Sequence, residues 1–186
     1  MNKSVIEVWS SILKSTPKSR LVLKSKQLAD PGIYQKTQHQ FETHGVDAGR
    51  LILMSDTMSY EDHLRQYEKM DIALDTFPYP GVTTSAEAIC MGVPVLTMRG
   101  HRFLSSTATS IAVNAGLPDW VASGSEDYIQ KAIHFASDAN KLAFLRRSLI
   151  DRSPSSPLFD TPRFAKSFGD ALWGMWRQGS KNVSLV

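Results

Sequence analysis

The middle of the chain, residues 70–98, reads MDIALDTFPYPGVTTSAEAICMGVPVLTM. Apolar runs at 72–74 and 93–97 predict two buried strands, and the segment 83–91 between them predicts a helix that stops at Gly92. Parallel strands need a crossover connection, which is most often a helix. This order of strand, helix and strand therefore predicts two neighbouring strands of a parallel sheet.

The same alternation continues on both sides of this stretch. Apolar runs predict further strands at 21–23, 51–54 and 120–122. Helical spacing, N-cap residues and glycine stops predict helices over 5–13, 31–44, 59–69, 103–115, 125–137, 139–151 and 162–177. We therefore predict an α/β fold, a doubly wound parallel sheet in one domain over residues 1–178 with a helical C-terminal extension, followed by a flexible tail at 179–186.

Composition narrows the class of protein. The 186 residues, 42% of them hydrophobic, are enough for one well-buried domain and too few for two ordinary ones. The 21 Lys and Arg against 18 Asp and Glu leave a net charge of +3, too small to predict nucleic-acid binding. Cys90, the only cysteine, excludes an internal disulfide, and its apolar surroundings predict that it is buried. With no apolar run of about 20 residues and no signal-peptide pattern, the sequence predicts a cytoplasmic protein with no membrane partner.

The loop at 75–82 is the first candidate for a functional site, because ligands of such sheets bind outside the carboxyl ends of the strands. Two prolines and Gly81 fix the loop in an extended path that leads to the hydroxyls of Thr83 and Thr84 at a helix start. Free backbone N–H groups and the positive end of the helix dipole favour an anion there, so both threonines are candidate phosphate ligands. The alternative is that Thr83 only caps the helix, a common role for threonine.

Glu87 and His63 are candidates beside the same loop. Glu87 lies one turn into the helix, where it either closes a capping box or accepts a hydrogen bond from a ribose hydroxyl, and spacing alone favours the capping box. His63 lies near the start of the preceding helix, from which it can border the same crevice, although exposed helical histidines are usually incidental. The remaining histidines show no metal-binding spacing, so no metal cofactor is expected.

Residues 70–76, Gly81, Thr83-Thr84 and 91–98 closely resemble the C-terminal catalytic region of the O-linked N-acetylglucosamine transferase family, including its bacterial members with tetratricopeptide repeats. Similar residues extend the likeness over nearly the whole chain, at Trp9, Ile12-Leu13, Pro17, 19–21, Gly45, Arg50-Leu51, Gly116-Leu117, Tyr128, Leu145-Arg146, 156–160 and Met175-Trp176. The resemblance implies the C-terminal half of a GT-B glycosyltransferase. In that fold two Rossmann-like domains face each other, and the C-terminal one holds most of the nucleotide sugar.

The resemblance also implies a substrate and roles for individual residues. The implied donor is UDP-N-acetylglucosamine, whose sugar is transferred with inversion to Ser or Thr hydroxyls without an essential metal. Gly81, Thr83 and Thr84 match the family's motif. In that motif the two threonines would bind the donor diphosphate. His63 would pack beside the uridine, and Glu87 would hydrogen-bond the ribose where the family more often has Asp.

Three positions depart from the family pattern. Val82 stands where the family often has His, which removes a potential phosphate donor. Ser106 stands where it tends to have Arg, which removes a positive charge near the donor. Glu87 in place of Asp can still accept from a hydroxyl, but from a shifted position. Together these changes predict a divergent donor site.

The resemblance further implies parts that this sequence does not contain. The first strand of the family's domain, and a lysine that contacts the diphosphate, would precede Met1, so the sheet is expected to be incomplete. The N-terminal half, which carries acceptor-side histidines, would have to be supplied by a longer protein or another chain. We expect no sugar transfer by this chain alone, because the transition state needs donor and acceptor held in one cleft. The alternatives are a non-catalytic nucleotide-binding subunit of a partner chain and a remnant that self-associates, for example as a homodimer, through an exposed apolar face.

Overall fold

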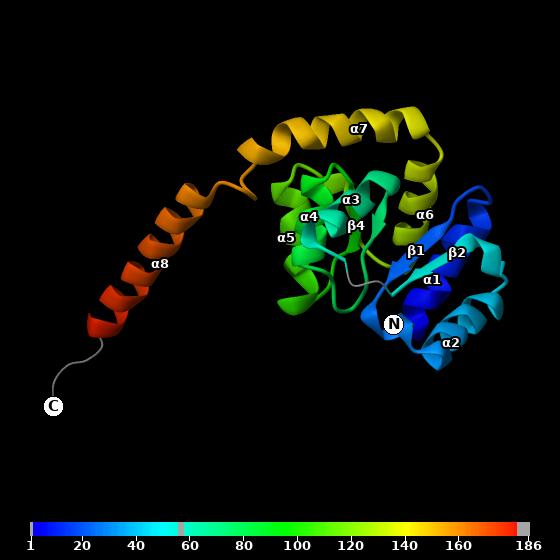
Figure 1. Ribbon diagram of the computed structural model, residues 1–186. Coiled ribbons are helices and arrows are strands. Elements are labelled where there is room, and N and C mark those ends of the chain that lie inside the picture. The colour runs from blue at the N-terminus through cyan, green and yellow to red at the C-terminus, as the bar shows by residue number, and fades with distance from the viewer. Residues whose placement is uncertain (1, 56–57, 182–186) are drawn as a thin grey trace.

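The computed structural model describes residues 2–55 and 58–181 (Figure 1). Helices and strands alternate through most of the chain, and helices alone follow the last strand. The strands are β1 (Leu21–Lys24), β2 (Leu51–Met54), β3 (Ala73–Leu74), β4 (Val95–Met98) and β5 (Val121–Ala122). The helices are α1 (Lys3–Ser15), α2 (Pro31–Glu42), α3 (Tyr60–Arg65), α4 (Thr83–Cys90), α5 (Thr107–Asn114), α6 (Ser125–Ala136), α7 (Ala139–Arg152) and α8 (Thr161–Lys181).

All the strand pairs are parallel, as predicted, but the strands form two separate ladders. In the first ladder β1 pairs with β2, with Leu21 opposite Leu51. In the second, β4 lies between β3 and β5. The predicted parallel α/β arrangement is confirmed, and within the described residues its strands are divided between these two ladders. A groove of about 600 Å³ is lined by residues of both β1 and β3, and among the described residues no strand pairing joins the two ladders.

The core lies around β4 and the helices beside it. Val95, Leu96 and Thr97 follow one another along β4 and are all buried, which requires that both faces of the strand are covered. Helices α5 and α6 both pack on β4 and β5. Helix α1 packs on α6 through its apolar face, which consists of Val5, Ile6, Val8, Trp9, Ile12 and Leu13.

Local signals explain where the elements of the central stretch begin and end. Helix α4 ends at Cys90, and Gly92 follows with φ of +77°, a left-handed conformation that glycine adopts without strain. A Cβ at this position would lie 2.9 Å from the backbone oxygen of Arg146 on α7. Gly92 therefore permits both the turn into β4 and the close approach of α7.

Helix α8 extends away from the other elements (Figure 1). It carries large exposed apolar side chains, among them Phe164, Phe168, Trp173, Met175 and Trp176. The helix continues through Lys181, past the predicted end at 177 and into the segment predicted as a flexible tail. The rest of that segment, 182–186, lies outside the described residues.

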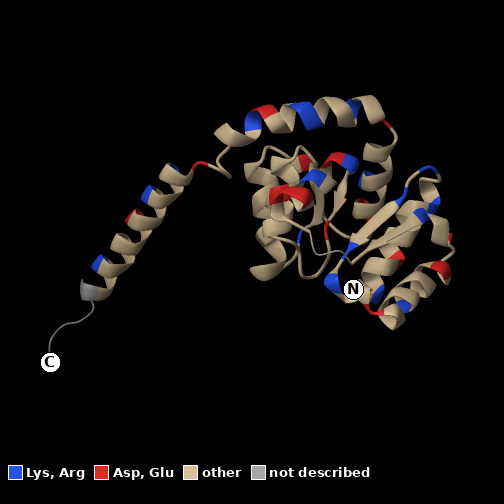
Figure 2. Cartoon of the chain, in the orientation of Figure 1, with Lys and Arg blue, Asp and Glu red and all other residues tan. Residues whose placement is uncertain are grey.

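Charged residues are distributed along the whole of the chain drawn in Figure 2, and along α7 and α8 Lys and Arg alternate with other residues. Within residues 2–55 and 58–181, no helix is both long enough and apolar enough to cross a membrane.

Candidate functional site

The carboxylate of Asp75 organises the loop that follows β3. Its Oδ1 accepts hydrogen bonds from the backbone N–H of Gly81 at 2.7 Å and of Thr76 at 3.0 Å, and its Oδ2 accepts from the Thr97 hydroxyl on β4 at 2.7 Å. Burial raises the pKa of Asp75 to about 6, although these hydrogen bonds oppose the shift. No role was predicted for Asp75 from the sequence. The signal that could have marked it is its position as an acidic residue directly after an apolar run.

Gly81 lies where the loop approaches the first turn of α4 most closely. A Cβ there would lie 2.5 Å from the Thr84 hydroxyl and 2.9 Å from the Ser85 hydroxyl. Within the loop, the Phe77–Pro78 peptide is cis. A side chain at position 81 would displace the Thr84 and Ser85 hydroxyls, and glycine avoids this while its N–H binds Asp75.

The start of α4 presents two exposed threonines. Helix α4 begins at Thr83, so the N-cap position is Val82, and the interpretation of Thr83 as the N-cap is wrong. Val82 has no side-chain hydrogen-bond acceptor with which to cap the first turn. The N-terminal N–H groups and the hydroxyls of Thr83 and Thr84 thus meet at the positive end of the helix dipole, where an anion would satisfy them.

Glu87 contacts His63 instead of closing a capping box. It is the fifth residue of α4, too far from the helix start for that motif, and its Oε2 lies 3.3 Å from His63 Nε2. The two side chains are largely buried, with 29% of His63 and 13% of Glu87 exposed. The Tyr67 ring lies edge-on to His63, at 5.6 Å between centroids. The structure thus brings His63 of α3 together with Glu87, which lies on the same helix, α4, as Thr83 and Thr84.

Two further groups that sequence analysis missed lie beside this pair. Lys24, at the end of β1, places Nζ 3.0 Å from His63 Nδ1. The Tyr67 hydroxyl donates to the Thr84 carbonyl oxygen at 3.3 Å, and burial, with Glu87 nearby, raises the pKa of Tyr67 to about 12. No local pattern marks Lys24, because it is 39 positions from His63 in the sequence.

Cys90 is exposed, so the prediction that it is buried is wrong. The buried side of α4 consists of Ser85, Ala88 and Ile89, and the helical rotation turns Cys90 away from that side. Partial burial and the negative charge of Glu87 nevertheless raise the pKa of the Cys90 thiol. Among the described residues, no group of three His, Cys, Asp or Glu side chains is arranged to hold a metal ion.

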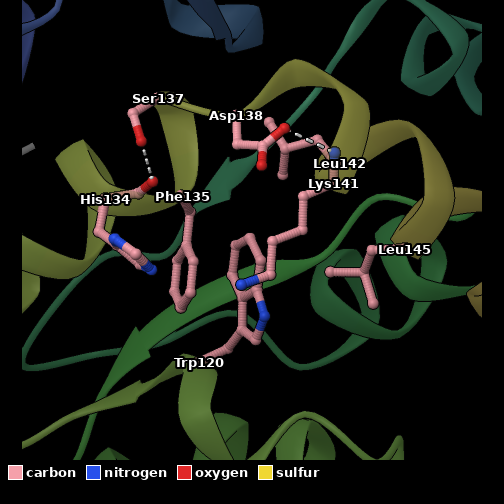
Figure 3. A pocket seen from close by; sticks show the side chains of 8 residues that line it. All are labelled: Trp120, His134, Phe135, Ser137, Asp138, Lys141, Leu142 and Leu145. Carbon is pink, nitrogen blue, oxygen red and sulfur yellow. Dashed lines mark hydrogen bonds between the residues drawn. The ribbon is translucent and has the colours of Figure 1, made fainter.

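Of two cavities among the described residues, one adjoins the candidate site and the other does not. A pocket of about 150 Å³ lies between α6 and α7, and Trp120 in its lining stacks on Phe135 with 3.9 Å between the ring centroids (Figure 3). None of the residues that line this pocket belongs to the candidate site. The larger groove between β1 and β3 includes Lys24 and His63 in its lining. The candidate site therefore borders the larger groove, at the carboxyl ends of the strands.

Comparisons with known proteins identify the family. The sequence model of Glycosyl transferase family 41 matches residues 1–168. SPINDLY of Arabidopsis thaliana, a probable UDP-N-acetylglucosamine–peptide N-acetylglucosaminyltransferase, is 37% identical over 95% of the chain. The UDP-N-acetylglucosamine–peptide N-acetylglucosaminyltransferase of Caenorhabditis elegans is 31% identical over 100% of it.

A solved structure agrees with these relatives. A mutant O-GlcNAc transferase of Thermobaculum terrenum superposes over 97% of this chain with a TM-score of 0.90 and 35% sequence identity. The chain spans 34% of that protein and only 19% of the Arabidopsis relative. The chain therefore belongs to glycosyltransferase family 41 and has the fold of the C-terminal GT-B domain of its O-GlcNAc transferases.

Proposed function

We propose that this chain is the donor-binding half of a cytoplasmic protein glycosyltransferase and that it binds UDP-N-acetylglucosamine for transfer to Ser or Thr hydroxyls. The observation that carries the proposal is the start of α4, where exposed Thr83 and Thr84 and uncapped backbone N–H groups follow Gly81. A diphosphate is the ligand that suits this arrangement, because N–H and O–H donors lie together in the first turn of α4, at the positive end of the helix dipole. The names of the relatives support the choice of sugar donor.

His63 and Glu87 are proposed to hold the nucleoside. The imidazole offers a flat face for the uracil ring, and the carboxylate can accept from a ribose hydroxyl. Glu87 lies four residues after Thr83, so the two side chains share a face of α4. A nucleotide with its diphosphate at Thr83 can thus place its ribose toward Glu87.

Thr83, Thr84 and the helix dipole are proposed to stabilise the leaving diphosphate during transfer, without an essential metal. The acceptor hydroxyl would be positioned by the other half of the GT-B cleft, in a longer protein or in a partner chain. Because positioning supplies much of the rate of such a reaction, the purified chain alone should show no transfer.

Calorimetric titration of the purified chain with UDP, UDP-N-acetylglucosamine, GDP and GDP-fucose tests donor binding. We expect saturable binding of the uridine nucleotides, at least tenfold weaker in a Thr83→Ala/Thr84→Ala variant, because each lost hydrogen bond to a charged phosphate weakens binding. Thr161→Ala is the matched control, since Thr161 is an exposed threonine at the start of the remote helix α8. EDTA should leave the affinity unchanged.

The outcomes separate the competing functions. Preference for a guanosine nucleotide would replace the proposed donor, and no binding by the folded chain would overturn the proposal. A second candidate, self-association of a chain that no longer binds nucleotide, is favoured by the exposed apolar side chains of α8. It predicts a concentration-dependent dimer in analytical ultracentrifugation, together with no nucleotide binding.

A further inference from the structure

Three side chains from three different elements are joined by successive contacts at the candidate site. Lys24 on β1 contacts His63 Nδ1 at 3.0 Å, and His63 on α3 contacts Glu87 Oε2 at 3.3 Å through its other ring nitrogen, Nε2. These contacts therefore connect the end of the first ladder to α4. The central member of the three is a histidine whose two nitrogens have different partners.

The chemistry of the two partners fixes the direction of each hydrogen bond. A lysine ammonium group only donates, so His63 Nδ1 must accept with its lone pair. A carboxylate only accepts, so His63 Nε2 must carry the ring hydrogen and donate it to Glu87. Both contacts are satisfied together only by the neutral imidazole with its hydrogen on Nε2.

We infer that Lys24 is a positioning residue that selects the Nε2–H tautomer of His63 and thereby sets the orientation of the Glu87 carboxylate. Without the ammonium group, only the Glu87 carboxylate holds the ring hydrogen on Nε2, so the Nδ1–H tautomer becomes more accessible. In that tautomer a lone pair of Nε2 faces the carboxylate. That repulsion would separate His63 from Glu87. Because both side chains are largely buried, a new position of either one changes the shape of the site.

This inference rests on the proposed function, in which His63 packs beside the base and Glu87 binds the ribose. It deepens that function because it gives Lys24, which need not touch the nucleotide, a share in determining how the nucleoside fits. The Tyr67 ring packs against His63, with 5.6 Å between the ring centroids. The tautomer of His63 is what a change at Lys24 should alter.

Long-range ¹H–¹⁵N NMR spectra of the histidine side chains test the inference, because they distinguish which ring nitrogen carries the hydrogen. The free chain and three variants, Lys24→Met, Lys24→Arg and Lys26→Met, would be compared near pH 8, with His63→Gln to assign the signal. We expect Nε2–H in the unmodified chain and in Lys24→Arg, which retains a donor, and a shift toward Nδ1–H in Lys24→Met. Lys26→Met is the matched control, because Lys26 is also exposed and lies two positions further along.

The UDP affinity of the same variants links the tautomer to binding. We expect about a tenfold loss in Lys24→Met and recovery to within about twofold in Lys24→Arg. An Nδ1–H tautomer in the unmodified chain, or an unchanged tautomer in a folded Lys24→Met variant, would overturn the role of Lys24. A changed tautomer with unchanged UDP affinity would overturn its effect on the site. If no variant binds UDP but the tautomer responds as expected, the proposed function fails while the assignment of Lys24 to His63 stands.

Discussion

The Asp75 carboxylate holds the loop before α4, and its protonation state depends on pH. Its folded pKa of about 6 lies above the ordinary value for an aspartate in an unfolded chain, because burial disfavours the charged form. The folded state therefore holds this proton more tightly than the unfolded state. The contribution of Asp75 to stability is fully present below about pH 4 and is lost as the pH rises through about 6.

An Asp75→Asn variant should remove this pH dependence. A shift of about two pKa units corresponds to about 3 kcal/mol. Between pH 4 and pH 7, the free energy of unfolding of the unmodified chain should therefore fall by about 3 kcal/mol relative to that of the variant. Urea unfolding at one-unit pH intervals measures the difference. Asp71→Asn, at an exposed carboxylate just before β3, should follow the unmodified chain. Parallel curves for Asp75→Asn and the unmodified chain would show that the carboxylate is not held as described.

Residue patterns located most of the secondary structure but few of the contacts at the site. The predicted strand at 51–54 is confirmed, and α4 starts at Thr83, as the predicted helix over 83–91 does. Apolar runs and helix signals act over a few residues, so a sequence can display them. The contacts of Asp75 with Thr97 and of Lys24 with His63 join elements far apart in the chain, and only the packing of those elements reveals them.

At the scale of elements, α4 shows how a local signal can mislead. A threonine pair at a helix start usually includes the N-cap, yet here Val82 takes that position. The hydroxyls consequently lie within the first turn and are exposed, which suits a ligand better than a cap. Likewise, the apolar neighbours of Cys90 predicted burial, but in a helix the face matters more than the neighbours in sequence.

Restoring a donor side chain at the start of α4 should strengthen nucleotide binding. Val82 is 51% exposed beside the first turn, so a larger side chain has room there. In Val82→His, an imidazole N–H directed at the diphosphate should lower the Kd for UDP roughly two- to tenfold, the range expected for one added hydrogen bond. Calorimetry measures the change, with Val82→Leu as the control for size. Equal affinities of the two variants would mean that the diphosphate does not lie at this end of α4.

At the scale of the whole molecule, the two ladders are separated where a Rossmann-like sheet has a central strand. Aliphatic side chains, including Leu21, Val22, Ile72 and Leu74, line part of the groove between β1 and β3, beside polar and charged ones. The Asn2 side chain donates to the Phe77 carbonyl oxygen at 2.6 Å, which places the start of α1 just beyond the carboxyl end of β3. A strand in the groove, parallel to β1 and β3, would therefore end close to the start of α1.

Such a strand would be joined to β1 through α1 as a parallel crossover, a connection that is almost always right-handed. It would also pair with the inner edges of both ladders and give the strand order of a Rossmann-like sheet. The groove is thus a surface at which an added strand could join the two ladders.

An added strand before Asn2 should stabilise the chain. A variant with five Val and Ile residues, joined to Asn2 through a short Gly-Ser link, would bury aliphatic side chains in the groove and pair the inner edges of β1 and β3. After the loss of chain entropy, a net gain of about 2 kcal/mol is reasonable, which corresponds to a rise in Tm of roughly 4–8 °C for a domain of this size. Thermal unfolding measures the rise, and binding of an apolar dye should fall in parallel. A Gly-Ser extension of equal length controls for the added chain, because it can pair but brings no side chains to fill the groove. If both extensions gave the same Tm, the groove would not be a strand site, and the two ladders would have to be regarded as a complete fold.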